Sequence, residues 1–157
     1  MNLDQQLAEV SLLPSQNWGK ALSISKKQFD EWVIRKLYSQ GYHEFKIAYI
    51  PVLVNIGPEG TGNKELAQRT RVTKQAVSKV LKDLEDYGYI TSKPAKDDKR
   101  NSIISLTDKG KKLVIASRIC MRELMDDYRR EFGAKEFDHL LLMLQRMIEY
   151  NDRKLLK

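Results

Sequence analysis

The segment over residues 63–106 constrains the fold of this chain more than any other part of the sequence. Asn63 is expected to cap a short helix over residues 64–70, because its side-chain oxygen can accept a hydrogen bond from the first helical turn. After a tight connection, Thr73 is the expected cap of a longer helix, which Gly88 stops. The sequence therefore predicts two helices joined by a short turn.

Two β-prone stretches follow these helices. Residues 89–92 and 102–106 are rich in β-branched and aromatic side chains, whereas residues 93–101 between them are polar and charged and include a proline. This pattern predicts a hairpin whose tip is too polar to be buried. Helix, turn, helix and hairpin in this order predict a winged helix-turn-helix, whose second helix enters the major groove of DNA.

The longer of the two helices has side chains that suit this role. On its polar face Gln75 can reach adenine edges, Lys74 can reach guanine or phosphate, and Ser78 can serve either. Lys79 and Lys82 are placed for phosphate contacts, which position a protein without reading the base sequence. The opposite face would anchor the helix on the domain through four apolar residues at helical spacing, Val77, Val80, Leu81 and Leu84.

The positive charge of the chain is concentrated in the same region. The formal net charge of +7 suggests a polyanionic partner, such as nucleic acid or an anionic membrane surface. A soluble basic protein without such a partner would also be compatible with the net charge alone. However, residues 61–100 hold ten basic and six acidic residues, whereas residues 1–60 hold six of each. This distribution favours a DNA-binding surface in the segment described above.

The remaining sequence predicts further helices on both sides of this segment. Residues 1–20 are expected to form an irregular arm or a short extra helix, and residues 57–62 a turn-rich loop. The expected fold class is mainly α, with about six helices and a small β-hairpin wing. The flanking helices are expected from Ser23 or Ser25 to about Gln40, over 45–55 with a kink or break at Pro51, from Thr107 to about Phe132, and over 135–153.

The most diagnostic motif lies in and after the predicted wing. It reads Asp98-x-Arg100, a spacer, and then a hydrophobic residue followed by x-Leu106-Thr107-x-x-Gly110. With this motif, residues 65–110 resemble the MarR family of transcription regulators. Further residues shared with that family are typical of many helix-turn-helix proteins: Glu65-Leu66-Ala67, Val77-Ser78, Leu81, Leu84-Glu85 and Gly88-Tyr89-Ile90.

The resemblance implies a role for each residue of the motif. Arg100 would enter the minor groove from the wing tip, and Asp98 would hold its guanidinium group. Leu106 would seat the wing on the core, Thr107 would cap the next helix, and Gly110 would allow close packing there. Taken alone, the aspartate–arginine pair would be interpreted as a solvated turn, but the downstream spacing favours the functional interpretation. The expected DNA-binding residues are thus Lys74, Gln75, Ser78, Lys79, Lys82, Asp98, Lys99 and Arg100.

The last predicted helix is apolar around most of its circumference, so it is expected to be buried on several sides. Its apolar residues are Phe137, residues 140–144, Met147 and Ile148. A second copy of the chain is the natural partner, and a monomeric helical bundle is the alternative. The resemblance also implies a homodimer. Twofold symmetry predicts a pseudo-palindromic operator with half-sites about 10 base pairs apart. The expected organisation is one unit over residues 1–157, with dimerisation helices at 20–55 and 107–157 and a DNA-binding lobe at 56–106.

The resemblance further implies repression as the usual mode and a small-molecule effector, commonly an anionic phenolic. The sequence does not identify an effector or its residues, and no cofactor or metal is expected. Cys120, the only cysteine, is expected to be a small buried hydrophobe in mid-helix rather than an oxidant sensor. Five aromatic residues could line an effector pocket, although such residues are usually part of a core: Trp18, Trp32, Tyr38, Tyr42 and Tyr49.

Other classes of function are less well supported by the sequence. It contains no nucleophile–base pair and no metal-ligand cluster, and the glycines of residues 57–62 lack the lysine–serine pair of a phosphate loop, so an enzyme is not expected. No apolar stretch is long enough to span a membrane and no secretion signal is visible, so a cytoplasmic protein is expected. The serious alternative is a winged helix used for protein–protein or RNA interaction.

Overall fold

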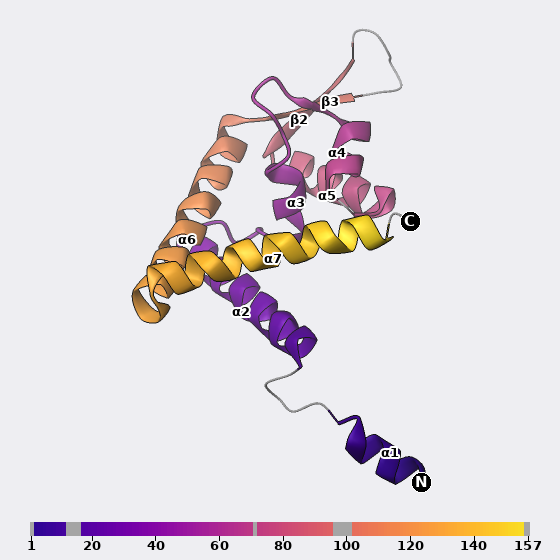
Figure 1. Cartoon of the computed structure of the whole chain (residues 1–157). Coiled ribbons are helices and arrows are strands. Elements are labelled where there is room, and N and C mark those ends of the chain that lie inside the picture. The colour runs from indigo at the N-terminus through magenta and orange to yellow at the C-terminus, as the bar shows by residue number, and fades with distance from the viewer. Residues whose placement is uncertain (1, 12–16, 71, 96–101, 156–157) are drawn as a thin grey trace. The chain divides into compact units, whose positions relative to one another are not determined.

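The computed structural model describes residues 2–11, 17–70, 72–95 and 102–155. Met1–Ile47 and Ala48–Lys157 form two compact units. The described residues contain seven α-helices and one three-stranded antiparallel sheet (Figure 1). The predicted fold class, mainly α with a small β wing, is therefore confirmed, with a short extra helix near the N-terminus.

The first unit contains α1 (Leu3–Glu9) and α2 (Trp18–Ser39). No residue of α1 is buried. The N-cap of α2 is Asn17, whose side-chain oxygen accepts a hydrogen bond of 3.0 Å from the backbone N–H of Lys20. The expected start at Ser23 or Ser25 is therefore wrong, because an earlier side chain already satisfies the first turn.

Two short helical pieces, the first of which begins at the last residue of the first unit, replace the expected single helix over 45–55. They are the 3₁₀ turn η2 (Ile47–Tyr49) and α3 (Ile50–Leu53). Pro51 lies in the first turn of α3. Proline is tolerated there because an N–H in the first turn has no partner within the helix. The expected break at Pro51 therefore takes the form of a new helix start.

The helix-turn-helix consists of α4 (Asn63–Arg69) and α5 (Lys74–Asp86). Thr73 caps α5 as predicted, because its hydroxyl accepts a hydrogen bond of 3.3 Å from the N–H of Ala76. The expected cap of α4 is wrong. Gly62 occupies the N-cap position without a side-chain hydrogen bond, and Asn63 is the first residue inside the helix.

The sheet joins a short strand before α4 to the two strands of the hairpin. Its strands are β1 (Thr61–Gly62), β2 (Ile90–Pro94) and β3 (Ser102–Leu106), in the order β1-β3-β2. β2 and β3 form the predicted hairpin and extend beyond α4 and α5 (Figure 1). β1 was expected to be part of a loop, and it forms because Thr61 pairs with Ile104 of β3.

Two long helices complete the second unit, α6 (Asp108–Phe132) and α7 (Ala134–Leu155). Gly133 separates them with a φ of 93°, a backbone conformation that favours glycine. At this corner, the ring centroids of Tyr128 and Phe137 lie 5.4 Å apart. Both predicted helices are therefore confirmed.

The core of the second unit lies between the sheet and the helices. Tyr49, Leu66, Leu84, Tyr89 and Leu113 are fully buried there. In the part of the chain that the structure describes, no helix combines the length and the hydropathy needed to cross a membrane.

Candidate nucleic-acid interface

The exposed face of α5 carries the residues predicted to read or grip DNA. Lys74, Gln75, Ser78, Lys79 and Lys82 are all exposed to solvent. The opposite face is buried through three residues, Val77, Val80 and Leu84. The predicted division of this helix into an anchoring face and a polar face is thus present in the structure.

Contacts within the second unit hold α5 in place. The hydroxyl of the fully buried Tyr49 donates a hydrogen bond of 3.3 Å to a carboxylate oxygen of Asp83 on α5. On the wing side, the backbone N–H of Ser92 donates to a carboxylate oxygen of Glu85 over 3.1 Å. These two acidic residues of α5 therefore contact structural partners, and the exposed polar residues of its first half remain available to a ligand.

The wing contributes exposed residues next to α5. All residues of β2 except Ile90 are exposed, including Lys93. Asp98, Lys99 and Arg100 lie outside the residues that the structure describes. Their contacts, and the insertion of Arg100 into a minor groove, therefore stay predictions.

The start of α6 packs against the end of α5, as the roles of Thr107 and Gly110 require. Thr107 is the N-cap of α6. A Cβ atom at Gly110 would overlap the carbonyl oxygen of Tyr89 and lie 3.0 Å from its carbonyl carbon. Only glycine allows the backbone of α6 to approach the β2 side so closely. Leu106 is half-buried at the base of the wing.

Lys109 has a structural role that was not predicted from the sequence. Its ammonium group donates a hydrogen bond of 2.8 Å to the carbonyl oxygen of Tyr87, the C-cap of α5, and lies 4.4 Å from the ring centroid of Tyr89. A cation in the first turn of α6 is disfavoured by the helix dipole. Lys111 lies in the same turn and pairs with Asp108 of its own helix, so the sequence carried no specific signal for a partner of Lys109 outside α6.

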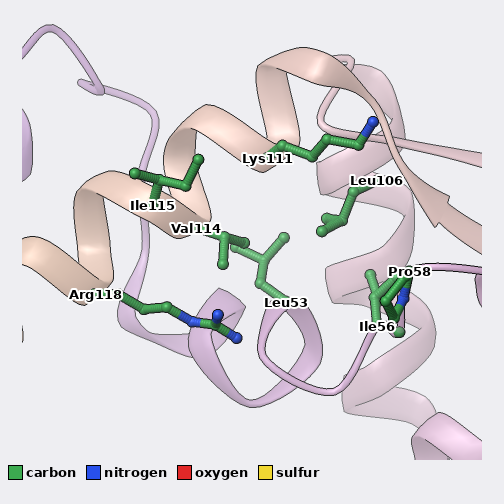
Figure 2. A pocket seen from close by; sticks show the side chains of 9 residues that line it. Leu53, Ile56, Pro58, Leu106, Lys111, Val114, Ile115 and Arg118 are labelled. Atoms are coloured by element: carbon green, nitrogen blue, oxygen red, sulfur yellow. The ribbon is translucent and has the colours of Figure 1, made fainter.

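A pocket of about 370 Å³ lies between α3, the residues that follow it, the end of β3 and α6. Figure 2 shows Leu53 and Val114 in its middle, with Arg118 and Lys111 at opposite ends. Lys111 forms an ion pair of 3.1 Å with Asp108, and the Arg118 side chain is exposed. The remaining lining is mainly apolar: Ile56, Gly57, Pro58, Leu106 and Ile115. The pocket therefore suits a compact apolar group that carries negative charge.

A broad apolar surface lies on α7. Among the α7 side chains that the structure describes, Phe137 alone is buried. Leu140, Leu142 and Ile148 are 51%, 55% and 46% exposed, and Leu144 is half-buried. A single chain thus leaves uncovered most of the apolar surface that was expected to need a partner.

Cys120 is fully buried in α6, which confirms the expected burial in mid-helix. Among the described residues, no three His, Cys, Asp or Glu side chains are grouped closely enough to hold a metal ion. None of the five aromatic residues considered for an effector pocket lines the pocket of α3 and α6. One of them, Tyr49, belongs to the core of the second unit.

Comparison with known sequences connects the helix-turn-helix segment to a family. Residues 46–101 match the MarR family model. The HTH-type transcriptional regulator Hpr of Bacillus cytotoxicus is 29% identical over 132 residues, which cover 83% of this chain and 60% of Hpr. The chain therefore spans about three fifths of the length of this curated relative.

Solved structures with the same architecture include a MarR transcriptional regulator from Methanosarcina mazei Go1. It superimposes with a TM-score of 0.74 at 21% identity, over 86% of this chain and 96% of that one. The PcaV transcriptional regulator from Streptomyces coelicolor, in complex with its natural ligand, gives a TM-score of 0.74 at 14% identity, over 89% and 97%. These proteins, like Hpr, are named as transcriptional regulators and not as enzymes. Residues 46–101 of this chain therefore match the MarR family in sequence, and the chain has the fold of MarR transcriptional regulators.

Proposed function

We propose that this chain is a sequence-specific regulator of transcription that binds duplex DNA through α5 and the wing. The observation that carries the proposal is the exposure of five polar residues on one face of α5, opposite a buried apolar face. Such a helix presents hydrogen-bonding groups to base edges in the major groove, while its lysines contact phosphates. The proposed reading residues are Gln75, Lys74 and Ser78, with Lys79 and Lys82 on the backbone.

Selection of bound sites from a random duplex library tests this proposal. We expect one recurrent sequence motif among the selected sites. The logarithm of the affinity for this motif should fall linearly with the logarithm of the salt concentration, because lysines that contact phosphates release counterions from the DNA. Gln75→Ala should relax the base preference at one position of each half-site, whereas Lys135→Gln on α7 should not. Tighter binding of RNA or of a protein partner, with no selected duplex motif, would support the alternative use of the winged helix.

The operator-binding form is proposed to be a twofold homodimer. The apolar surface of α7 supports this, because exposed side chains of this size are stabilised when a second copy covers them. A symmetric dimer would bind a pseudo-palindromic operator with half-sites about 10 base pairs apart. Shifting the half-site spacing by five base pairs should therefore abolish high-affinity binding, because it places the second site on the opposite side of the duplex.

We further propose that the chain represses transcription and that an anionic aromatic ligand relieves repression from the pocket of α3 and α6. Its apolar middle would hold a ring, and Lys111 or Arg118 would pair with a carboxylate. The complex of the structurally similar PcaV with its natural ligand is consistent with this use of the fold. Calorimetric titration with a panel of aromatic carboxylates, repeated with Arg118→Gln, tests it. Binding that is equally strong in the variant would contradict the assigned role of Arg118.

A further inference from the structure

A second, smaller pocket lies between the two helices of the helix-turn-helix. It has a volume of about 170 Å³, and seven residues line it: Asn63, Lys64 and Ala67 from α4, and Lys74, Val77, Ser78 and Leu81 from α5. We propose that this pocket takes one phosphate group of the DNA backbone, and that Asn63 and Lys64 are positioning residues of the interface. The inference rests on the proposed DNA binding and adds two residues that the sequence did not assign to it.

The side chain of Asn63 does not take the capping role that its position at the start of α4 suggests. Gly62 is the N-cap of α4, so the Asn63 amide does not cap the helix. Its Oδ1 atom is buried and, within the described part of the chain, accepts no hydrogen bond. A buried oxygen without a donor destabilises the folded protein, and in natural proteins such an atom usually has a donor from a water, an ion or a ligand, or serves a functional role.

The chemistry around the pocket fits a phosphate. Lys64 and Lys74 approach it from different helices, Ser78 adds a hydroxyl group, and none of the seven lining residues is acidic. Phosphate oxygens accept hydrogen bonds and do not donate them, so an anion there requires donors on the protein. A lysine ammonium has three donors, so a lysine that binds the phosphate can also donate to Oδ1 of Asn63. The amide nitrogen of Asn63 can then donate to the phosphate itself.

The apolar part of the pocket also suits the DNA backbone. Ala67, Val77 and Leu81 provide surface that the deoxyribose next to a phosphate can contact. Lys74 and Ser78 belong both to this pocket and to the proposed reading face of α5, so the two surfaces are continuous. A phosphate held here would fix the position of α5 in the groove, in the way that the first helix of a helix-turn-helix crosses the backbone.

Lys64→Gln removes one charge from the proposed phosphate site without changing the size of the side chain much. We expect the slope of log affinity against log salt to become shallower by about 0.9, the value for one lost phosphate contact. The affinities for operator and for unrelated duplex DNA should fall by the same factor, because a backbone contact reads no sequence. The matched control is Lys135→Gln on α7, which should leave the salt slope unchanged.

Asn63→Ala separates a DNA-positioning role from a structural one. We expect operator affinity to fall severalfold, whereas the melting temperature of the free protein stays the same or rises, because the variant removes a buried oxygen without a partner. A lower melting temperature together with unchanged operator affinity would assign Asn63 to the fold and overturn its proposed role.

Single methylphosphonate substitutions along the operator locate the phosphate. Each one neutralises one backbone charge. We expect one position per half-site at which the substitution weakens the wild type but has no further effect on Lys64→Gln. If the wild type binds a selected operator, and Lys64→Gln leaves both the salt slope and the methylphosphonate profile unchanged, the phosphate site is refuted while the proposed function stands. If the wild type binds no duplex DNA, the proposed function itself fails.

Discussion

The hydroxyl group of Thr107 donates a hydrogen bond of 2.7 Å to the backbone carbonyl oxygen of Gly88. The same hydroxyl oxygen accepts a hydrogen bond of 3.1 Å from the N–H of Gly110 and so caps α6. One side chain therefore fixes both the start of α6 and the turn that ends α5. Leu106 and Lys111, on either side of Thr107 along the chain, line the pocket of α3 and α6, so the pocket and the proposed reading helix share a structural support.

Thr107→Val should test this support, because it keeps the shape of the side chain but removes the hydroxyl group. We expect the free energy of unfolding to fall by about 0.5–2 kcal/mol through the lost helix cap, because water can pair with the exposed carbonyl oxygen of Gly88. Urea denaturation measures this change. Thr107→Ser, which keeps the hydroxyl, is the control, and equal stability of the two variants would contradict the role assigned to the hydrogen bonds.

Gly110→Ala should be strongly destabilising. The added methyl group would overlap the backbone carbonyl of Tyr89, which cannot move without separating α6 from the sheet. Overpacking of this kind costs about 1–3 kcal/mol and occasionally more. Thermal unfolding measures the loss. Gly19→Ala is the matched control, because the nearest atom to a Cβ there is 4.0 Å away and alanine is a better helix former. A similar melting temperature for both variants would refute the close approach at Gly110.

Arg100→Ala should weaken duplex binding severalfold or more with the proposed dimer intact. The reason is the wing motif, which implies that the guanidinium group enters a narrow minor groove. A gel-shift titration against the selected operator measures the affinity, and light scattering on the same sample measures the oligomeric state. An unchanged affinity would show that Arg100 does not contribute to DNA binding.

Leu144→Arg should dissociate the proposed homodimer, because it places a charge within the apolar surface of α7 and burying an unpaired charge is costly. Light scattering should then report the mass of one chain. Gln145→Arg, at the adjacent polar position that pairs with Glu149, adds a charge of the same sign and should leave the mass unchanged. A dimeric Leu144→Arg protein would show that α7 is not the interface.

Features set by neighbouring residues could be predicted from the sequence. Thr73 and Thr107 cap their helices as expected, since an N-cap hydroxyl bonds to a backbone N–H only three residues away. The polar and apolar faces of α5 followed from helical periodicity in the same way. Local chemistry also suggested Asn63 as the cap of α4, but the pairing of β1 with the distant strand β3 places Gly62 there.

Sites built from distant segments could not be predicted in this way. Leu53 and Arg118 are 65 positions apart in the chain and line one pocket only because α3 packs near α6. Similarly, Asn63 and Ser78 have unrelated sequence contexts, and they meet because α4 packs against α5. The periodicity of a single helix carries no information on which residues of another helix will face it.

The position of β3 in the middle of the sheet has a mechanical consequence. β3 is bonded to β1, which leads into α4, and to β2, which follows α5, and its own chain continues into α6. A displacement of α6 along its axis would therefore move α4 and α5 together, and the angle between these two helices would stay the same. We expect the amide protons of Ile103 and Ile104 to be among the slowest to exchange with deuterium, since their release requires this whole lobe to open.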